Sequence, residues 1–187
     1  MTFSDSPKQA LVDHLRAHAV RTDGTFGLRS GETSSWYIDA RQTTFDGAGA
    51  TVVGAAVLEE VPDGVVAVGG MTMGADPIAV ATAMAGAAGG RSLVSFSIRK
   101  EAKDHGVGGG LVGPVRHGDR VVALEDTTTT GSALAEAIAA LRAEGVDVLK
   151  AVALVDRSAG AAARRMAEIQ VPYVALVTPS DLGVEDA

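Results

Sequence analysis

The sequence predicts an α/β domain with a mainly parallel sheet flanked by helices. Four short apolar runs, and a weaker fifth, lack the alternation of apolar and polar residues that marks a half-exposed strand. Strands that are buried on both faces of a parallel sheet have this pattern. The runs recur roughly every 20 to 30 residues, which leaves room for one crossover helix between neighbouring strands. Strands and helices therefore alternate, as they do in a doubly wound sheet.

The predicted strands are bounded by glycine, proline or charged residues. They cover residues 65–68, 93–96, 121–124, 151–155 and 173–177, and the run at 93–96 is the weakest.

Helices are predicted between these strands and before them. In the segment 132–145, Leu134, Ile138 and Leu141 share one face, Ser132 or a neighbouring threonine is placed to cap the start, and a glycine ends it. An alanine-rich helix is predicted over residues 77–88, and an amphipathic helix over residues 11–19.

The first part of the chain differs from the rest. Residues 26–45 combine glycine, serine, threonine and aromatic residues, which is typical of short strands or loops outside a main sheet. We expect a single domain over residues 1–187, in which roughly residues 1–50 and the C-terminal tail form a small cap (hood) on a core of residues 51–165.

Composition excludes several classes of function. A net charge of −7 and an aromatic content of 4% disfavour nucleic-acid binding. The absence of cysteine excludes disulfides and thiol chemistry. No signal peptide or membrane-spanning run is evident, so we expect no membrane association and a cytoplasmic location.

The most informative segment is the strand–loop–helix unit at residues 121–134. The strand ends in Glu125 and Asp126, and four threonines, a glycine and a serine precede the helix. Ligands of α/β sheets bind beyond the carboxyl ends of strands, and helix N-termini bind anions. We therefore expect a phosphate over residues 129–133 and ribose hydroxyl groups on the two carboxylates. The alternative is that Asp126 and the threonines only cap the helix.

A second segment concentrates positive charge in this acidic protein. Arg99, Lys100, Lys103 and His105 lie within seven residues, and glycines follow them. Such a loop can close over an anion such as pyrophosphate and neutralise charge that develops on a leaving group. The alternative is a solvated surface loop.

Together, the two segments resemble the orotate phosphoribosyltransferase family, which belongs to the type I phosphoribosyltransferases. The acidic pair followed by Thr-x-Gly-Ser is similar to the family's motif for phosphoribosyl pyrophosphate (PRPP), and Arg-Lys-Glu-Ala-Lys-Asp-His-Gly is similar to its catalytic loop. The resemblance implies catalytic roles for Lys103, Asp104 and His105. It implies PRPP binding by Arg99, Lys100, Lys103, His105, Glu125, Asp126, Thr127, Thr128, Thr129, Thr130, Gly131, Ser132 and Ala133.

Two glycine-containing segments extend the resemblance. Phe-Gly-Leu-Arg-Ser-Gly at residues 26–31 is similar to a Phe-x-Leu-Lys-Ser-Gly segment, which implies PRPP binding by Arg29 although arginine replaces lysine. The loop within residues 68–77 implies pyrophosphate binding at Met73 and Gly74, where some members carry a lysine in place of the glycine.

The remaining matches concern orotate. Residues 34–39 resemble the wall of the orotate pocket, which implies contacts from Tyr37 and Ile38, whereas Trp36 can equally be a core aromatic of the cap. Arg157 follows a predicted strand, and a guanidinium suits the orotate carboxylate. The resemblance implies orotate binding by Arg157 and Thr129, and the alternative for Arg157 is a surface ion pair with its neighbour Asp156.

The implied reaction transfers the phosphoribosyl group of PRPP to orotate, giving orotidine 5′-monophosphate and pyrophosphate in de novo pyrimidine biosynthesis. The resemblance also implies Mg²⁺ held mainly by PRPP, with no protein ligand, and a homodimer that shares the 100–110 loop across its interface. Two alternatives are a phosphoribosyltransferase for another base, which Arg157 disfavours, and a non-catalytic PRPP-sensing regulator, which the Lys-Asp-His loop disfavours.

Overall fold

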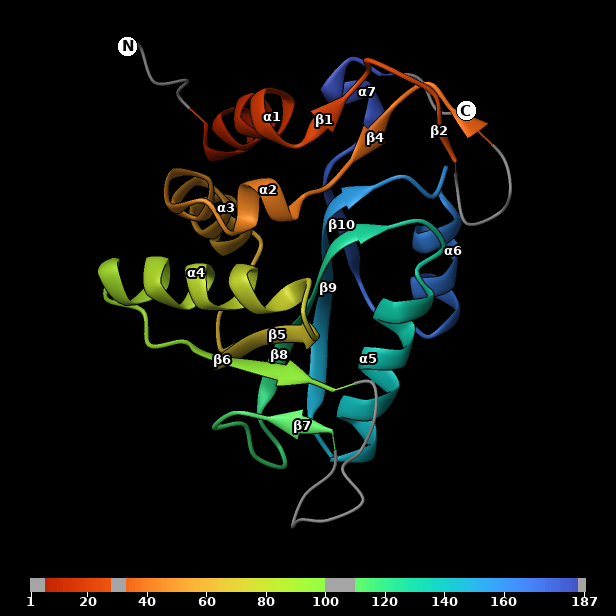
Figure 1. Cartoon of the computed structure of the whole chain (residues 1–187). Coiled ribbons are helices and arrows are strands. Elements are labelled where there is room, and N and C mark those ends of the chain that lie inside the picture. The colour runs from red at the N-terminus through yellow and green to blue at the C-terminus, as the bar shows by residue number, and fades with distance from the viewer. Residues whose placement is uncertain (1–5, 28–32, 100–109, 185–187) are drawn as a thin grey trace.

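The computed structural model describes residues 6–27, 33–99 and 110–184, and a six-stranded sheet forms its centre (Figure 1). Its strands are β5 (Ala67–Met71), β6 (Val94–Ile98), β7 (Leu111–Val112), β8 (Arg120–Thr128), β9 (Asp147–Asp156) and β10 (Tyr173–Val177). They are ordered β10-β9-β8-β5-β6-β7. Neighbouring strands are parallel except β7, which runs antiparallel to β6. The predicted mainly parallel sheet is therefore confirmed, including the weakest strand.

Helices cover both faces of this sheet. One face carries α1 (Pro7–His18), α3 (Gly47–Glu59) and α4 (Ala75–Ala88), and the other carries α5 (Ser132–Ala143) and α6 (Ala161–Glu168). The predicted helices near residues 11–19, 77–88 and 132–145 correspond to α1, α4 and α5. Within the described part of the chain, no helix is long and apolar enough to cross a membrane.

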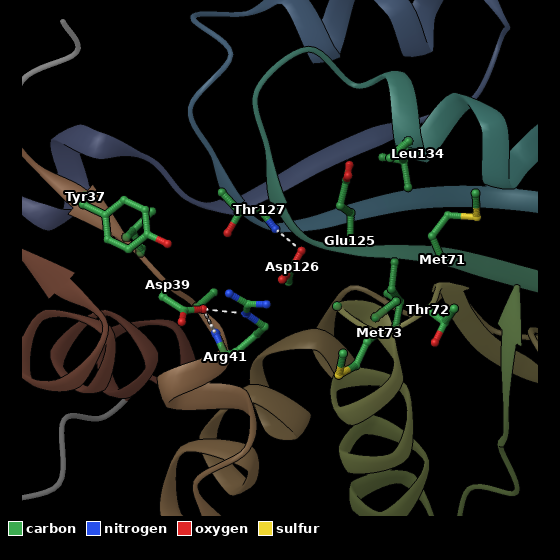
Figure 2. Close-up of a pocket in the computed structure, with 16 residues that line it drawn as sticks. Tyr37, Asp39, Arg41, Met71, Thr72, Met73, Glu125, Asp126, Thr127 and Leu134 are labelled. Carbon is green, nitrogen blue, oxygen red and sulfur yellow. Dashed lines mark hydrogen bonds and ion pairs between the residues drawn. The ribbon is translucent and has the colours of Figure 1, made fainter. Parts of the chain in front are cut away.

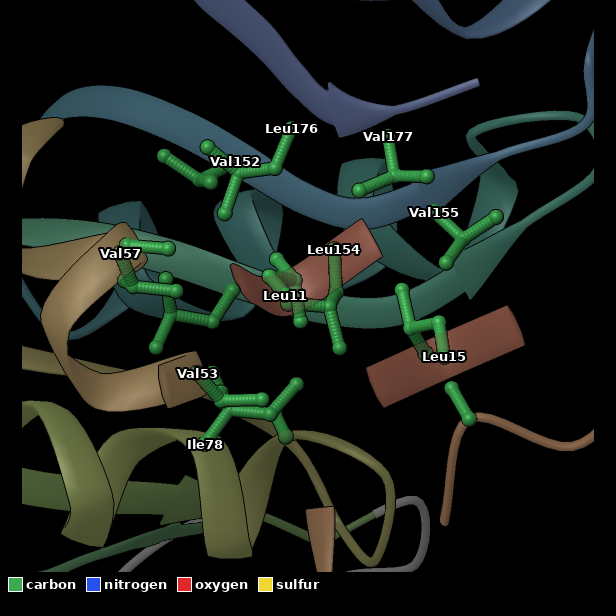
Figure 3. Close-up of a cluster of buried hydrophobic side chains, with 14 of the residues drawn as sticks. Leu11, Leu15, Val53, Val57, Ile78, Val152, Leu154, Val155, Leu176 and Val177 are labelled. Atoms are coloured by element: carbon green, nitrogen blue, oxygen red, sulfur yellow. The ribbon is translucent and has the colours of Figure 1, made fainter. Parts of the chain in front are cut away.

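The central strands direct alternate side chains into two separate cores. On β8, Val122 and Leu124 join the core beneath α1, α3 and α4, whereas Val121 and Ala123 join the core beneath α5 and α6. Figure 3 shows the first core, where side chains of α1, α3 and α4 meet those of β9 and β10. Burial on both faces removes any need for polar alternation, which is why these strands read as continuous apolar runs.

Strand β5 differs in position from the prediction. It begins at Ala67, two residues late, and it continues through Gly69 and Gly70, which were expected to start a loop. A Cβ on Gly69 would overlap the carbonyl oxygen of Phe96, and a Cβ on Gly70 would overlap that of Leu124. The two glycines therefore serve close packing between neighbouring elements inside the sheet rather than loop flexibility.

The cap combines segments from both ends of the chain. It contains α1 and α7 (Pro179–Leu182), the antiparallel pairs β1 (Val20–Arg21) with β4 (Tyr37–Ile38) and β2 (Phe26–Gly27) with β3 (Thr33–Ser34), and the short helix α2 (Arg41–Thr44). The Nε atom of Arg16 donates a hydrogen bond to the carbonyl oxygen of Leu182 at 3.1 Å. Lys8 Nζ lies 3.4 Å from Asp181 Oδ1, so α1 and α7 are joined side by side (Figure 1).

Helix α3 was not predicted, because glycine lowers helix propensity and this segment contains three glycines. Tertiary packing requires the small residues. A Cβ on Gly54 would lie 2.5 Å from the carbonyl oxygen of Ala81, so α3 and α4 approach each other closely. Asp46 caps the helix by accepting a hydrogen bond from the backbone N–H of Gly49 at 2.8 Å. The boundary predicted at residue 50 falls inside α3.

Candidate active site

A cavity of about 440 Å³ lies where the carboxyl ends of β5 and β8 face the cap (Figure 2). The cap contributes Tyr37 and the segment from Ile38 to Arg41. The sheet side contributes the turn after β5 and the end of β8, together with the start of α5. This is the edge at which α/β sheets bind ligands. The lining residues are Tyr37, Ile38, Asp39, Ala40, Arg41, Met71, Thr72, Met73, Gly74, Ala75, Leu124, Glu125, Asp126, Thr127, Ala133 and Leu134.

Strand β8 carries the two predicted acids into this cavity. Glu125 and Asp126 both line it, and the backbone N–H of Thr127 donates to Asp126 Oδ1 at 2.7 Å. Burial raises the pKa of the Asp126 carboxyl, while that backbone hydrogen bond and the charge of Arg41 oppose the rise. Asp126 also lies directly against Gly74, where a Cβ would come within 2.6 Å of the carboxyl carbon. A larger residue at this position, such as the lysine that some family members carry, would therefore require the Asp126 side chain to move.

The predicted phosphate cradle is a tight turn between β8 and α5. The buried hydroxyl of Thr128 accepts a hydrogen bond from the N–H of Gly131 at 2.9 Å. Gly131 has φ of +73°, and a Cβ there would lie 2.9 Å from the Cα of Ala162 on α6. The turn thus depends on glycine for both conformation and space. The first N–H groups of α5 have no acceptor inside the helix, and Ala133 and Leu134 of this helix line the cavity.

Of the two predicted alternatives for the start of the helix, Ser132 itself is not the cap, and a neighbouring threonine contributes instead. Ser132 is the first residue of α5, and Gly131 occupies the N-cap position without a side chain. Thr130, one residue earlier, accepts from the N–H of Ser132 at 3.3 Å, and the two hydroxyl groups lie 2.9 Å apart. Gly145 has φ of +70° just after the helix, as predicted for its end.

The turn between β5 and α4 is held by a carboxylate that the sequence analysis did not identify. Asp76 accepts hydrogen bonds from Thr72 Oγ1 and from Ser97 Oγ, each at 2.7 Å. The Thr72–Met73 peptide bond is cis. The predicted pyrophosphate residues Met73 and Gly74 therefore lie in a turn tied to both α4 and β6.

Asp39 and Arg41 are also cavity residues without a predicted role. Arg41 Nε donates to Asp39 Oδ1 at 2.7 Å, and the backbone N–H of Arg41 donates to the same oxygen at 3.2 Å. The available signal was a cation two residues after a carboxylate, directly following the predicted pocket wall.

Only two of the four predicted orotate residues line the cavity, and Thr129 is not one of them. Tyr37 and Ile38 line the cavity, but Arg157 does not. The backbone N–H of Arg157 donates to the carbonyl oxygen of Thr128 at 2.8 Å, which places Arg157 beside the phosphate turn. Its guanidinium carbon lies 3.8 Å from the ring centroid of Trp36, which is only 1% exposed. Trp36 is therefore a core residue that also forms a cation–π contact.

The residue before Arg157 has its own partners. Asp156 accepts from Tyr173 Oη at 2.9 Å and from the backbone N–H of Ser158 at 2.7 Å. Burial, with this hydrogen bond, raises the pKa of the Tyr173 phenol. Asp156 consequently anchors the loop after β9 to β10.

Most of the predicted basic residues lie outside the part of the chain that the structure describes. Arg29, Lys100, Lys103, Asp104 and His105 lie outside it. Arg99 is exposed just after the end of β6, and its backbone N–H donates a hydrogen bond to the carbonyl oxygen of Gly110 at 2.8 Å. Among the residues that the structure describes, no group of three or more His, Asp or Glu side chains could hold a metal ion.

Comparisons with known proteins agree on one family. The chain is 40% identical over 182 residues to an orotate phosphoribosyltransferase of Streptomyces avermitilis, covering 97% of this chain and all of that protein. It is 38% identical to one of Aquifex aeolicus over 164 residues, covering 86% and 88%. No protein-family model matches.

Solved structures give the same result. Orotate phosphoribosyltransferase of Mycobacterium tuberculosis H37Rv in complex with Fe(III) dicitrate has a TM-score of 0.84 at 33% identity, covering 96% of this chain and 100% of that one. Its complex with PRPP has a TM-score of 0.81 at 29% identity, with the same coverage. The mainly parallel sheet, the two acids at the end of β8 and the similarity to these relatives together show that the chain belongs to the orotate phosphoribosyltransferase family.

Proposed function

We infer that this protein transfers the phosphoribosyl group of PRPP to orotate, which gives orotidine 5′-monophosphate and pyrophosphate in pyrimidine biosynthesis. The observation that carries the inference is the end of β8, where Glu125 and Asp126 line a cavity and a glycine-dependent phosphate turn follows them. The family relationship supports the same reaction. The cytoplasmic location expected from the sequence is part of this proposal.

PRPP would be held along the carboxyl edge of β5 and β8. Its 5-phosphate would bind at residues 129–133, where the N-terminus of α5 favours negative charge. The ribose hydroxyl groups would donate to Glu125 and Asp126, and the diphosphate would bind at the turn of Met73 and Gly74. Positive charge to neutralise the phosphate groups of PRPP would come from Arg29, Arg99 and Lys100.

Bond cleavage at the anomeric carbon builds positive charge on the ribose and negative charge on the departing pyrophosphate. The protein contributes by holding the reactants in line and by placing fixed charges where they are needed. Lys103, Asp104 and His105 would act on the leaving group when their loop closes and excludes water.

Magnesium would accompany PRPP. The cavity offers carboxylate oxygens of Glu125 and Asp126, which suit a hard cation. Mg²⁺ would neutralise charge on the diphosphate, and PRPP itself with water would supply most of its ligands.

Orotate would bind between the cap and the phosphate turn. Tyr37 and Ile38 provide a partly apolar wall, and Thr129 would contact the base. Arg157 would pair with the orotate carboxylate through two parallel hydrogen bonds.

A homodimer that shares the 100–110 loop is also part of the proposal. Support comes from large apolar side chains that are exposed on α4 and beside α2: Met84 is 68% exposed, Phe45 61% and Val80 50%. Val80 and Met84 are four residues apart on α4 and share one face, and exposed apolar faces mark interfaces between protein chains.

The direct test follows the ultraviolet absorbance of orotate with purified protein, PRPP and Mg²⁺. We expect a loss of the orotate signal that requires both PRPP and Mg²⁺, with orotidine monophosphate as product. In the same assay, Lys103→Ala should lower turnover much more than it weakens PRPP binding. PRPP binding without turnover of orotate would contradict the proposed function, and a panel of other bases would then identify the acceptor.

A further inference from the structure

The cavity has an unusual charge balance for a site that binds a polyanion. Asp39, Glu125 and Asp126 all line it with carboxylates. Among the lining residues that the structure describes, Arg41 contributes the only cationic side chain. Neither the sequence pattern nor the family resemblance gave Arg41 a role.

Arg41 is held by Asp39 in a way that leaves part of its guanidinium available. Asp39 Oδ1 accepts from Nε and from the backbone N–H of Arg41, at 2.7 and 3.2 Å, while Gln42 Nε2 donates to the other oxygen at 3.2 Å. The guanidinium holds the pKa of the Asp39 carboxyl below its usual value. Because Nε makes the contact with Asp39, the two terminal Nη groups remain for a second anion. The Arg41 side chain is 49% exposed.

The guanidinium of Arg41 points into the cavity. Figure 2 shows it directed from α2 toward Asp126, with the Met73 turn on the facing wall. Burial raises the pKa of the Asp126 carboxyl, and the positive charge of Arg41 opposes part of that rise. Met73 and Gly74, the two residues proposed for the diphosphate, both line the cavity with Arg41, whereas Ala133 is the only residue of the proposed 5-phosphate site (129–133) that does. Arg41 is therefore assigned to the diphosphate rather than to the 5-phosphate.

We propose that Arg41 is a further PRPP-binding residue, which contacts the diphosphate group through its Nη atoms, and that Asp39 positions it. The assignment rests on the proposed function, because it takes PRPP as the ligand. Charge-assisted hydrogen bonds from arginine to phosphate are among the strongest polar contacts in proteins. Arg41 also offsets the repulsion between the diphosphate and the neighbouring carboxylates.

The test compares Arg41→Gln with a matched control, Arg21→Gln. Arg21 lies on β1 of the same cap, and its Nε is 3.2 Å from Asp23 two residues away, but Arg21 does not line the cavity. Both variants remove one positive charge from an exposed arginine–aspartate pair. The measurements are the KM for PRPP, the KM for orotate at saturating PRPP, and inhibition by pyrophosphate or by ribose 5-phosphate, all with Mg²⁺.

We expect Arg41→Gln to raise the KM for PRPP and the inhibition constant of pyrophosphate by about tenfold or more, as the loss of a charge-assisted hydrogen bond predicts. The inhibition constant of ribose 5-phosphate and the KM for orotate should stay within about twofold of the wild type, since Arg41 is assigned to the diphosphate. Arg41→Lys should recover part of the loss, Asp39→Asn should give a smaller loss, and Arg21→Gln should match the wild type.

Equal values for Arg41→Gln and Arg21→Gln would overturn the assignment, as would an effect confined to ribose 5-phosphate. Calorimetric titration with magnesium pyrophosphate separates this inference from the proposed function. If the wild type binds pyrophosphate but does not use orotate, the proposed function fails. The Arg41 assignment is then decided by whether Arg41→Gln weakens that binding. Thermal melting of both variants checks that folding is retained.

Discussion

Substitution of Gly74 by alanine should impair PRPP binding without unfolding the protein. Gly74 has helical torsion angles (φ −61°, ψ −41°), so alanine fits the backbone. The added Cβ would lie 2.6 Å from the carboxyl carbon and Oδ1 of Asp126, about 0.8 Å closer than the nearest ordinary contact of 3.4 Å. The Asp126 side chain must move by that amount, and any such shift disturbs its 2.7 Å hydrogen bond with the N–H of Thr127.

A displacement of this size removes most of one charge-assisted hydrogen bond to the ribose, which is worth about 1.5–3 kcal/mol. The expected result is a rise of about 10- to 100-fold in the KM for PRPP. The orotate absorbance assay measures this, and urea unfolding should show a change in stability below about 1 kcal/mol. Gly47→Ala is the control, because a Cβ there meets nothing within 4 Å. If Gly74→Ala and Gly47→Ala have the same KM for PRPP, the steric reasoning is refuted.

Three further predictions concern Gly131 in the turn before α5, the contact between Trp36 and Arg157, and the carboxyl group of Asp126. Gly131→Ala should lower the free energy of unfolding by about 2 kcal/mol or more, because φ is +73° and the Cα of Ala162 lies 2.9 Å from the new Cβ; an unchanged urea midpoint would contradict this. Trp36→Leu and Arg157→Gln should show a coupling of about 1–2 kcal/mol in a double-mutant cycle of urea unfolding, whereas additive effects would exclude the cation–π contact. Asp126→Asn should weaken PRPP binding but stabilise the protein at pH 7. The folded-state pKa of Asp126 is raised above 3.8, so proton binding favours the folded state and the ionised carboxylate opposes folding. The stability difference should shrink as pH falls through the raised folded-state pKa toward 3.8 and should level off below 3.8, and a constant difference between pH 7 and pH 3.5 would contradict this reasoning.

The sequence predicted the central sheet because its strands carry a strong signal. Residues 121–124 and 151–155 are apolar throughout, since each face of the sheet meets a layer of helices. The turn between β8 and α5 was predicted for a similar reason, because acids, threonines and a glycine between a buried strand and a helix mark a strand–loop–helix unit, whereas phosphate binding there stays a prediction.

Helix α3 and the end of β5 were missed because their glycines serve close packing with distant segments. Gly54 fits against Ala81, and Gly69 fits against Phe96. Local propensity predicts that such glycines end a helix or strand. Their presence inside these elements is explained only by the segments that pack against them in the folded protein.

Arg41 and Asp76 were missed for a related reason. Arg41 meets Asp126 only after the cap folds over the sheet, and Asp76 meets Ser97 only after β6 pairs with β5. No local sequence spacing encodes either contact. Arg157 was found from its place after β9, but its packing on Trp36 was not predictable because it joins the cap to the core.

The pairing of α1 with α7 sets an order of events during protein synthesis. A growing chain that has emerged through α6 already contains the phosphate turn and Ala162, against which Gly131 packs. At that stage Arg16 still lacks its acceptor, the carbonyl oxygen of Leu182. The core contacts of α1 with α3 are available by then, so folding of the nascent chain can begin before α7 is made, and the contacts between α1 and α7 are the last to form.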